Sequence, residues 1–302
     1  MYRSEYLYNN IDLLIKDEEV FPICVPSYSR PNASFLSYCK NLPIHLFIRR
    51  EEYELYKKYE DDCKIILLDD VNDIGETRRE IVNWAIENSV HDIFMVDDDV
   101  TSVHFNIPGD SSTSDKQFMK SWYTINNVPW TAELKFFKMW MWMLTLCDKR
   151  ITMSAPGQRS DWWNIKYKDE PITYNRGTPI QCLHLNISNL VDKGINYNST
   201  KIDGAEDYAM IYRIMKSGLY TTLFTDLAYC VPSVGSGEGG CNKTESRDLT
   251  ERYNLFIERF MNNVLDEEDK YRVSTKTSKG GLQSIKFNWN YWRIPEKRPW
   301  GI

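Results

Sequence analysis

The chain has 302 residues, of which 42% are hydrophobic and 14% aromatic, so it is large and apolar enough to fold around a core and does not have the composition of a disordered protein. A formal net charge of -6 excludes a uniformly basic nucleic-acid coat but leaves a local basic face open. The seven cysteines form no CxxC pair or zinc knuckle, and this favours reduced thiols in a cytoplasmic protein.

The first third of the chain alternates short apolar runs with helical stretches. Strands are predicted at residues 21–26, 44–48, 64–68 and 92–96, and helices at residues 32–40, 50–60 and 76–89. This alternation is typical of βαβ units, which form a mostly parallel sheet with helices on its faces. Ligands bind such sheets at the carboxyl ends of the strands. The turns SYSRPN, DDVNDIG and DDDV would all lie on that edge.

The second half is less regular. The pattern predicts a buried helix at 131–148, strands at 151–156, 180–186 and 220–231, a polar loop at 157–177, and helices within 203–218 and 247–265. The charged residues 1–16 do not resemble a secretory signal, and the most apolar stretch, residues 139–147, is too short to cross a bilayer. With no convincing linker or repeat, we expect one domain over residues 1–245, with residues 246–302 as a helix and a basic, aromatic extension packed on it.

Three consecutive carboxylates, Asp97, Asp98 and Asp99, follow the predicted strand at 92–96. Like charges repel and are costly to desolvate unless a positive group lies among them. Two carboxylates at i and i+2 can converge on Mg²⁺ or Mn²⁺, which also accept phosphate oxygens. The alternative is a solvated acidic turn, but the position at the end of a strand favours a metal site.

Two further motifs carry charge near a helix start. In DIGETRRE, Arg78 and Arg79 fall in the first turns of a helix, where backbone N–H groups favour anions such as phosphate, or else they pair with neighbouring glutamates. Farther on, Glu206 and Asp207 precede a predicted helix. One of these carboxylates beside a reacting hydroxyl would be a general base, although acids at a helix start are also explained by the helix dipole.

The remaining candidates are weaker. The glycine-rich GSGEGG at 235–240 lacks the spacing and lysine of a P-loop, and the four histidines show no ligand spacing. From Lys270 to the C-terminus, eight lysines and arginines and a single glutamate are interleaved with aromatic residues. Such a segment suits phosphate backbones and exposed bases, but it equally suits a tail that packs its aromatic residues on the domain.

Together, the motifs VPSYSRP, TRREI, DDD and GAEDYAMIYR resemble those of a GT-A nucleotide-sugar glycosyltransferase. Over about residues 20–110, PSYSRPN, IRREEYELYKKY, DIGETRREIV and FMVDDDV are similar to the phage DNA-base glycosyltransferases related to the TET/JBP-associated group. The resemblance implies a GT-A, Rossmann-like α/β fold with Mn²⁺ or Mg²⁺ on Asp97 and Asp99, and Asp207 as the catalytic base beside Glu206. It also implies that the donor contacts Pro26, Ser27, Tyr28, Arg30, Gly75, Arg78, Asp97 and Asp98. Some GT-A enzymes add a late histidine as a metal ligand, but this chain has no histidine after His184.

The function that the resemblance implies is metal-dependent, inverting transfer of glucose or arabinose from a UDP-sugar to the hydroxymethyl group of a modified base, 5-hydroxymethylcytosine, in phage DNA. The location would be the cytoplasm, that of the host if a phage encodes the chain, with no membrane partner. Two alternatives stay open. One is the same chemistry on a protein or glycan acceptor, and the other is a catalytically silent GT-A-like module that only binds nucleic acid.

Overall fold

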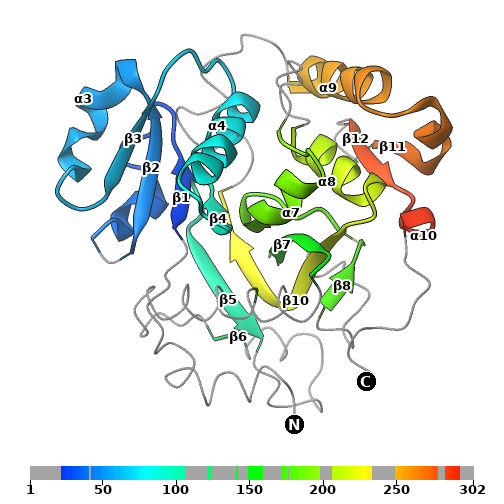
Figure 1. Cartoon of the computed structure of the whole chain (residues 1–302), viewed down its shortest axis with the longest axis horizontal. Helices are drawn as coiled ribbons and strands as arrows, with labels where there is room; N and C mark the ends of the chain where they lie inside the picture. The colour runs from blue at the N-terminus through cyan, green and yellow to red at the C-terminus, as the bar shows by residue number, and fades with distance from the viewer. Residues whose placement is uncertain are drawn as a thin grey trace.

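The computed structural model describes residues 22–40, 42–106, 122–123, 141, 149–158, 172–175, 177–197, 206–232, 249–277 and 283–292. In these residues a ten-stranded sheet runs through the molecule in the order β3-β2-β1-β4-β9-β7-β10-β5-β6, with β8 paired to β10. Figure 1 shows helices α4, α7 and α8 gathered along the sheet, with α9 and a small hairpin at one end. The predicted α/β class with helices flanking a central sheet is confirmed.

The four strands predicted in the first third of the chain form as expected. Strands β1 (Ile23–Pro26), β2 (Ile44–Arg49), β3 (Lys64–Leu68) and β4 (Asp92–Val96) are parallel neighbours. All residues of β1 and β4 are buried, as expected for strands covered on both faces. Successive side chains therefore point to opposite faces of the sheet and pack into two separate hydrophobic clusters. Cys24, Ile93 and Met95 belong to one hydrophobic cluster, and Val25 and Phe94 belong to the other.

The connections in this half are more broken than the sequence pattern suggests. The predicted helix at 32–40 is a 3₁₀ helix, η1 (Ser34–Tyr38), and residues 50–60 form η2 (Arg50–Glu52), α3 (Tyr53–Tyr56) and η3 (Lys57–Tyr59). Helix α4 (Ile74–Glu87) is regular, and its start is fixed by Asp73, whose side chain accepts a hydrogen bond from the Glu76 amide at 2.7 Å. Its buried residues recur at helical spacing, which turns one face toward the sheet: Gly75, Arg78, Ile81, Val82 and Ala85.

The second half makes the sheet mixed rather than mostly parallel. Strand β9 (Cys182–Asn186) lies antiparallel to both β4 and β7 (Ile151–Gln158), whereas β7 and β10 (Tyr220–Cys230) are parallel. The long β10 also pairs antiparallel with β5 (Ser102–Asn106) and β8 (Ile172–Tyr174), and β5 pairs with β6 (Trp122–Tyr123). Periodicity identifies strands but not their direction, so the predicted parallel order holds for β1 to β4 and for β7 with β10.

The C-terminal elements complete the core beside α8 (Glu206–Lys216). They are α9 (Leu249–Asn263), η6 (Glu267–Arg272), the hairpin of β11 (Val273–Thr277) and β12 (Gln283–Phe287), and α10 (Trp289–Trp292). Phe260, Phe287 and Trp292 are buried in the same cluster as the inner face of α8. A short helix, α7 (Ile187–Asp192), was not predicted. None of the described helices has the length and apolar character needed to span a bilayer.

Several predicted segments lie outside the described residues. They are the helix at 131–148, apart from Met141, and most of the loop at 157–177. The glycine-rich stretch at 235–240 and the end of the basic extension from residue 293 are also outside the described part of the chain.

Candidate active site

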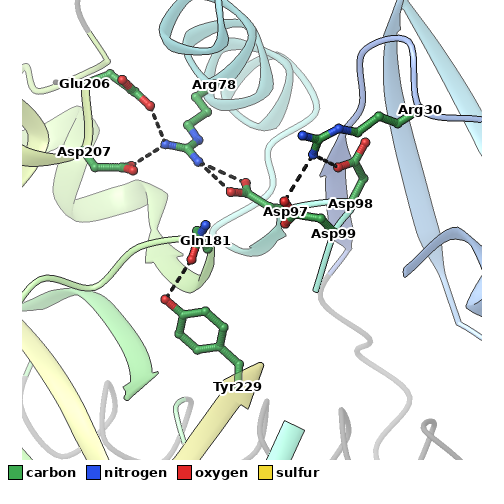
Figure 2. A network of polar contacts seen from close by, with 9 residues as sticks. All are labelled: Arg30, Arg78, Asp97, Asp98, Asp99, Gln181, Glu206, Asp207 and Tyr229. Carbon is green, nitrogen blue, oxygen red and sulfur yellow. Dashed lines mark hydrogen bonds and ion pairs between the residues drawn. The ribbon is translucent and has the colours of Figure 1, made fainter. Parts of the chain in front are cut away.

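The candidate site lies where the turns after β1 and β4 meet the N-terminal ends of α4 and α8 (Figure 2). These two turns, which were predicted to share one edge of the sheet, are in direct contact, since Ser27 and Arg30 bond Asp98. The third turn joins them through Arg49, whose Nη2 donates to the Asn72 carbonyl at 2.8 Å. Five carboxylates and two guanidinium groups gather here, from segments more than a hundred residues apart: Asp97, Asp98, Asp99, Glu206, Asp207, Arg30 and Arg78.

Arg78 is the centre of one half of this cluster. Its Nη1 donates to Glu206 Oε1 at 2.8 Å and to Asp207 Oδ1 at 2.5 Å, and its Nη2 contacts both oxygens of Asp97 at 3.0 and 3.2 Å. The arginine side chain is 3% exposed. A single buried guanidinium therefore joins a predicted metal ligand to both predicted catalytic acids. Arg79 instead bonds its neighbour Glu80 at 2.9 Å, so the two arginines of the motif have different roles.

The charges around Arg78 are not balanced, since three carboxylates face one cation. Burial, followed by the charge of Asp207, raises the pKa of Glu206 to about 8, while Arg78 opposes this shift. The pKa of Asp207 is also raised by burial, against the lowering effect of Arg78. Oε2 of Glu206 has no hydrogen-bond partner on another described residue. The site thus favours one further positive charge, a proton or a cation, among these acids.

Arg30 forms the second half of the cluster. Its Nη1 lies 3.1 Å from Asp98 Oδ1 and 3.1 Å from Asp99 Oδ2. Asp98 turns back under the β1 loop, where Ser27 Oγ donates to its Oδ2 at 2.5 Å and the side chain is only 6% exposed. Burial raises the pKa of Asp98 to about 7 despite these two donors. Both oxygens of Asp98 are bonded to protein groups in this arrangement.

The β1 loop is held in an unusual conformation. Ser29 has φ 53°, in the left-handed region that few residues other than glycine adopt, and both its amide and its hydroxyl donate to the buried carboxylate of Glu52. Tyr56 also braces the loop, since its hydroxyl lies 2.8 Å from Ser27 Oγ and accepts from the Arg30 amide at 2.9 Å. Pro26 ends β1 directly before this loop.

Tyr28 carries the one aromatic ring on the loop that the resemblance assigned to the donor. Its face is covered by the Arg49 guanidinium, whose carbon lies 3.9 Å from the ring centroid. This stacking fixes the ring beside the edge of the sheet where the carboxylates gather.

Gly75 allows α4 and α8 to approach each other. A Cβ at this position would lie 3.2 Å from Glu206 Cβ and 3.2 Å from Asp73 Oδ1. The role of this glycine in the described structure is therefore close packing against a catalytic candidate, which brings Arg78 within reach of Glu206 and Asp207.

Three residues at the site were not identified from the sequence. Gln181 adopts φ 62°, its carbonyl accepts from the Asp97 amide at 2.7 Å, and its side chain accepts from the Tyr229 hydroxyl at 3.2 Å (Figure 2). Tyr197 is buried, and the charges of Asp207, Arg78 and Glu206 act on the pKa of its phenol, which burial raises. None of them stands in a charged motif, and only the fold brings them to this edge.

The donor set fits a divalent cation with an incomplete protein shell. Asp99 Oδ1 is buried without a hydrogen-bond partner on another described residue, and carboxylates outnumber guanidinium groups at the site. Such an excess of hard oxygen ligands suits Mg²⁺ or Mn²⁺, which often keep water or phosphate oxygens as further ligands. Within the described part of the chain, the acidic trio whose oxygens lie within 4.8 Å of one another is Asp266, Glu268 and Asp269, and Lys216 Nζ bonds all three. The described carboxylates of the candidate site form no such trio.

The described part of the basic extension is largely engaged in packing and ion pairs. Lys270 bonds Glu267, and Arg272 lies 3.0 Å from Asp269. Phe287 and Trp292 are buried, whereas Lys286 and Tyr291 are exposed. The alternative of a tail that packs its aromatic residues on the domain therefore describes Phe287 and Trp292, whereas the ion pairs of Lys270 and Arg272 are local to η6. Arg293 and the residues after it lie outside the described chain.

Neither protein-family models nor curated proteins match this sequence. Among solved structures, it is similar to GalNAc-T7 with UDP, GalNAc and Mn²⁺, at 11% identity and a TM-score of 0.36, over 71% of this chain and 44% of that one. It is also similar to mannose-1-phosphate geranyltransferase from Thermus thermophilus, at 9% identity and a TM-score of 0.37, over 70% of this chain and 75% of that one. The chain thus spans less than half the length of GalNAc-T7. At such low identities and TM-scores, its function must be inferred from its own residues.

Proposed function

We propose that this protein is a metal-dependent glycosyltransferase that moves a sugar from a UDP-sugar to an acceptor hydroxyl. The observation that carries the proposal is the cluster of five carboxylates around Arg30 and Arg78 at the carboxyl ends of β1 and β4. An excess of buried carboxylates suits a divalent cation, and two arginines beside them suit a diphosphate. A metal-bound nucleoside diphosphate meets both requirements together.

Asp97 and Asp99 would hold Mg²⁺ or Mn²⁺, which supplies charge stabilisation to the departing diphosphate when bound. Arg78 and Arg30 would turn from these carboxylates to the phosphate oxygens, since a guanidinium binds phosphate and carboxylate with the same fork of N–H groups. The β1 loop, with Ser27 and Tyr28, would take the nucleoside.

Asp207 is the proposed general base. The acceptor hydroxyl oxygen attacks the anomeric carbon, the bond from that carbon to the UDP oxygen breaks, and the hydroxyl proton passes to Asp207. Because the attack is in line with the breaking bond, the configuration at the anomeric carbon is inverted. Asp207 is suited to this because burial raises the pKa of its carboxyl, and a base works best with a pKa close to the working pH. Glu206, whose pKa burial and the charge of Asp207 raise to about 8, would remain protonated beside it.

The test of this chemistry is UDP-sugar turnover in wild type and matched variants. We expect EDTA and Asp99→Asn to abolish turnover and to weaken metal-dependent UDP binding. Asp207→Asn should lower kcat by about 10²–10⁴-fold while UDP still binds, and Glu206→Gln should have the milder effect. Full activity in EDTA would reject the metal assignment, and the reverse ranking of the two variants would make Glu206 the base.

The proposed acceptor is a hydroxymethylated base in DNA, with 5-hydroxymethylcytosine as the first choice. Support comes from the motifs of residues 20–110 that resemble phage DNA-base glycosyltransferases. The experiment offers a mixture of UDP-glucose and UDP-arabinose with hydroxymethylated or plain DNA and measures the mass added to the base. Mass gained only on hydroxymethylated DNA supports this acceptor and identifies the sugar.

A protein or glycan acceptor is the second candidate, and one observation favours it. Lys270 and Arg272, at the start of the basic extension, are paired with carboxylates and do not leave a strongly positive face. Lys286→Ala tests the difference, because its exposed cation is available to contact the phosphate groups of DNA. A higher KM for DNA and a flatter salt dependence would support DNA. UDP-sugar hydrolysis with no sugar on either DNA would support another acceptor.

A further inference from the structure

Tyr197 is a buried tyrosine whose hydroxyl makes no hydrogen bond in the described structure. Its side chain is 1% exposed, and its hydroxyl has no hydrogen-bond partner among the described residues. Native proteins rarely leave a buried hydroxyl unpaired, since the unmade hydrogen bond costs stability. An unpaired donor at this position therefore indicates a partner that is present only in another state of the site.

The charges that act on the Tyr197 hydroxyl are those of the catalytic candidates. Burial raises the pKa of its phenol well above the ordinary value, and among the charges Asp207 has the largest effect, followed by Arg78. The phenol is therefore a neutral O–H donor, and the proposed base is among the charges that act on it.

The backbone of Tyr197 is held by the two helices that carry the site. Its amide donates to its neighbour Asn196 at 2.7 Å, and Asn196 in turn accepts from Arg213 on α8 and donates to Asn83 on α4, at 3.3 and 2.9 Å. Helix α4 carries Arg78 and α8 carries Asp207, so the backbone at residues 196 and 197 is tied to both helices of the site.

We propose that Tyr197 is a positioning residue whose hydroxyl donates a hydrogen bond to Asp207 when Arg78 turns to the donor diphosphate. In the ligand-free structure Arg78 Nη1 bonds Asp207 at 2.5 Å. A carboxylate held by a guanidinium is a weak base, because the ion pair stabilises its charged form. A neutral phenol holds the same carboxylate in place with a smaller loss of basicity. The inference rests on the proposed function, since it needs Asp207 to be the base and Arg78 to bind phosphate.

The experiment compares Tyr197→Phe with wild type, and uses Tyr212→Phe as the matched control. Tyr212 is also a buried tyrosine, but its hydroxyl donates to Asp269 at 2.8 Å, away from the site. Steady-state kinetics use whichever of UDP-glucose and UDP-arabinose the wild type hydrolyses with Mg²⁺, calorimetry measures binding of UDP with Mg²⁺, and a thermal melt gives Tm.

For Tyr197→Phe we expect kcat to fall about ten- to a hundredfold, the range for one hydrogen bond to a charged group, with KM for the UDP-sugar and the Kd for UDP unchanged. Its Tm should stay equal or rise, because the removed hydroxyl has no partner in the ligand-free protein. Tyr212→Phe should show the opposite pattern, with a lower Tm and an unchanged kcat.

Three outcomes overturn the inference. If wild type is active and Tyr197→Phe has the same kcat, the hydroxyl is idle and only this inference fails. If the Kd for UDP weakens instead of kcat falling, Tyr197 contacts the donor and does not position Asp207. A wild type that neither binds UDP with Mg²⁺ nor hydrolyses a UDP-sugar overturns the proposed function, and this inference with it.

Discussion

Replacing Glu206 with glutamine tests whether the cluster carries surplus negative charge. Glu206 has a pKa of about 8 in the folded protein against an ordinary value of 4.5, because of burial and the charge of Asp207. A folded-state pKa that is raised means that the native state binds the proton more tightly than the unfolded state does. Stability from this group is therefore complete below about pH 4.5 and is lost as the pH rises toward 8.

The loss can be estimated. Each pH unit over which the native state holds one proton more than the unfolded state changes the free energy of unfolding by about 1.4 kcal/mol. Between pH 6 and pH 8, Glu206 should therefore cost the wild type about 2 kcal/mol. Glu206→Gln keeps the shape of the side chain and its contact with Arg78 but cannot ionise. From pH 6 to pH 8 the free energy of unfolding of this variant should therefore fall by about 2 kcal/mol less than that of the wild type. Asp98 titrates in both proteins, so the difference between them reports Glu206 together with its interacting neighbour Asp207.

The assay is urea unfolding of the ligand-free protein at pH 6 and pH 8, without divalent cations. The control is Glu54→Gln, since the Glu54 side chain is 79% exposed and lies 3.9 Å from Lys57. Exposed pairs of this kind contribute little, so this variant should follow wild type. Equal losses in wild type and Glu206→Gln would show that Glu206 is not held with a raised pKa, and the idea of surplus charge would be wrong.

Two further variants test the packing of the cluster. Arg78→Met removes the cation shared by three buried carboxylates. In urea unfolding it should lower the free energy of unfolding by about 3–5 kcal/mol at pH 8, with a smaller loss at pH 6. An equal loss at both pH values would mean that the carboxylates do not take up protons in place of the arginine. Gly75→Ala places a Cβ 3.2 Å from Glu206 Cβ and should cost about 1 kcal/mol and reduce kcat by displacing α8, whereas unchanged kcat would show that α8 tolerates the shift.

The fold was predictable where local pattern and topology agree. The apolar runs at 21–26 and 92–96 become β1 and β4 because short buried strands between helices permit few other arrangements. Strand β5 was missed because its sequence SVHFN is short and directly follows the acidic turn. The antiparallel direction of β9 was also missed, since its direction depends on how the chain returns to the sheet and not on the residues of the strand.

The residues of the candidate site that stand in charged sequence motifs could be predicted. Asp97, Arg78 and Asp207 stand in charged motifs, and the structure brings all three into direct contact. Their pairing through one guanidinium could not be derived from spacing, because 129 residues separate Arg78 from Asp207. Tyr197 gives no sequence signal, since a tyrosine among asparagines looks like many surface turns and acquires its place only through the packing of α4 and α8.

The docking of the C-terminal elements limits how the chain can be shortened. Asn175 beside β8 donates to the carbonyl of Trp292 at 3.1 Å, and Tyr212 on α8 packs edge-on against both Phe260 and Trp292. A chain that ended at residue 245 would expose the apolar face of α8 that these elements cover, and exposed apolar patches promote aggregation. A protease that removed these elements should thus destabilise the domain without touching the candidate site, and expression trials should retain residues 249–292.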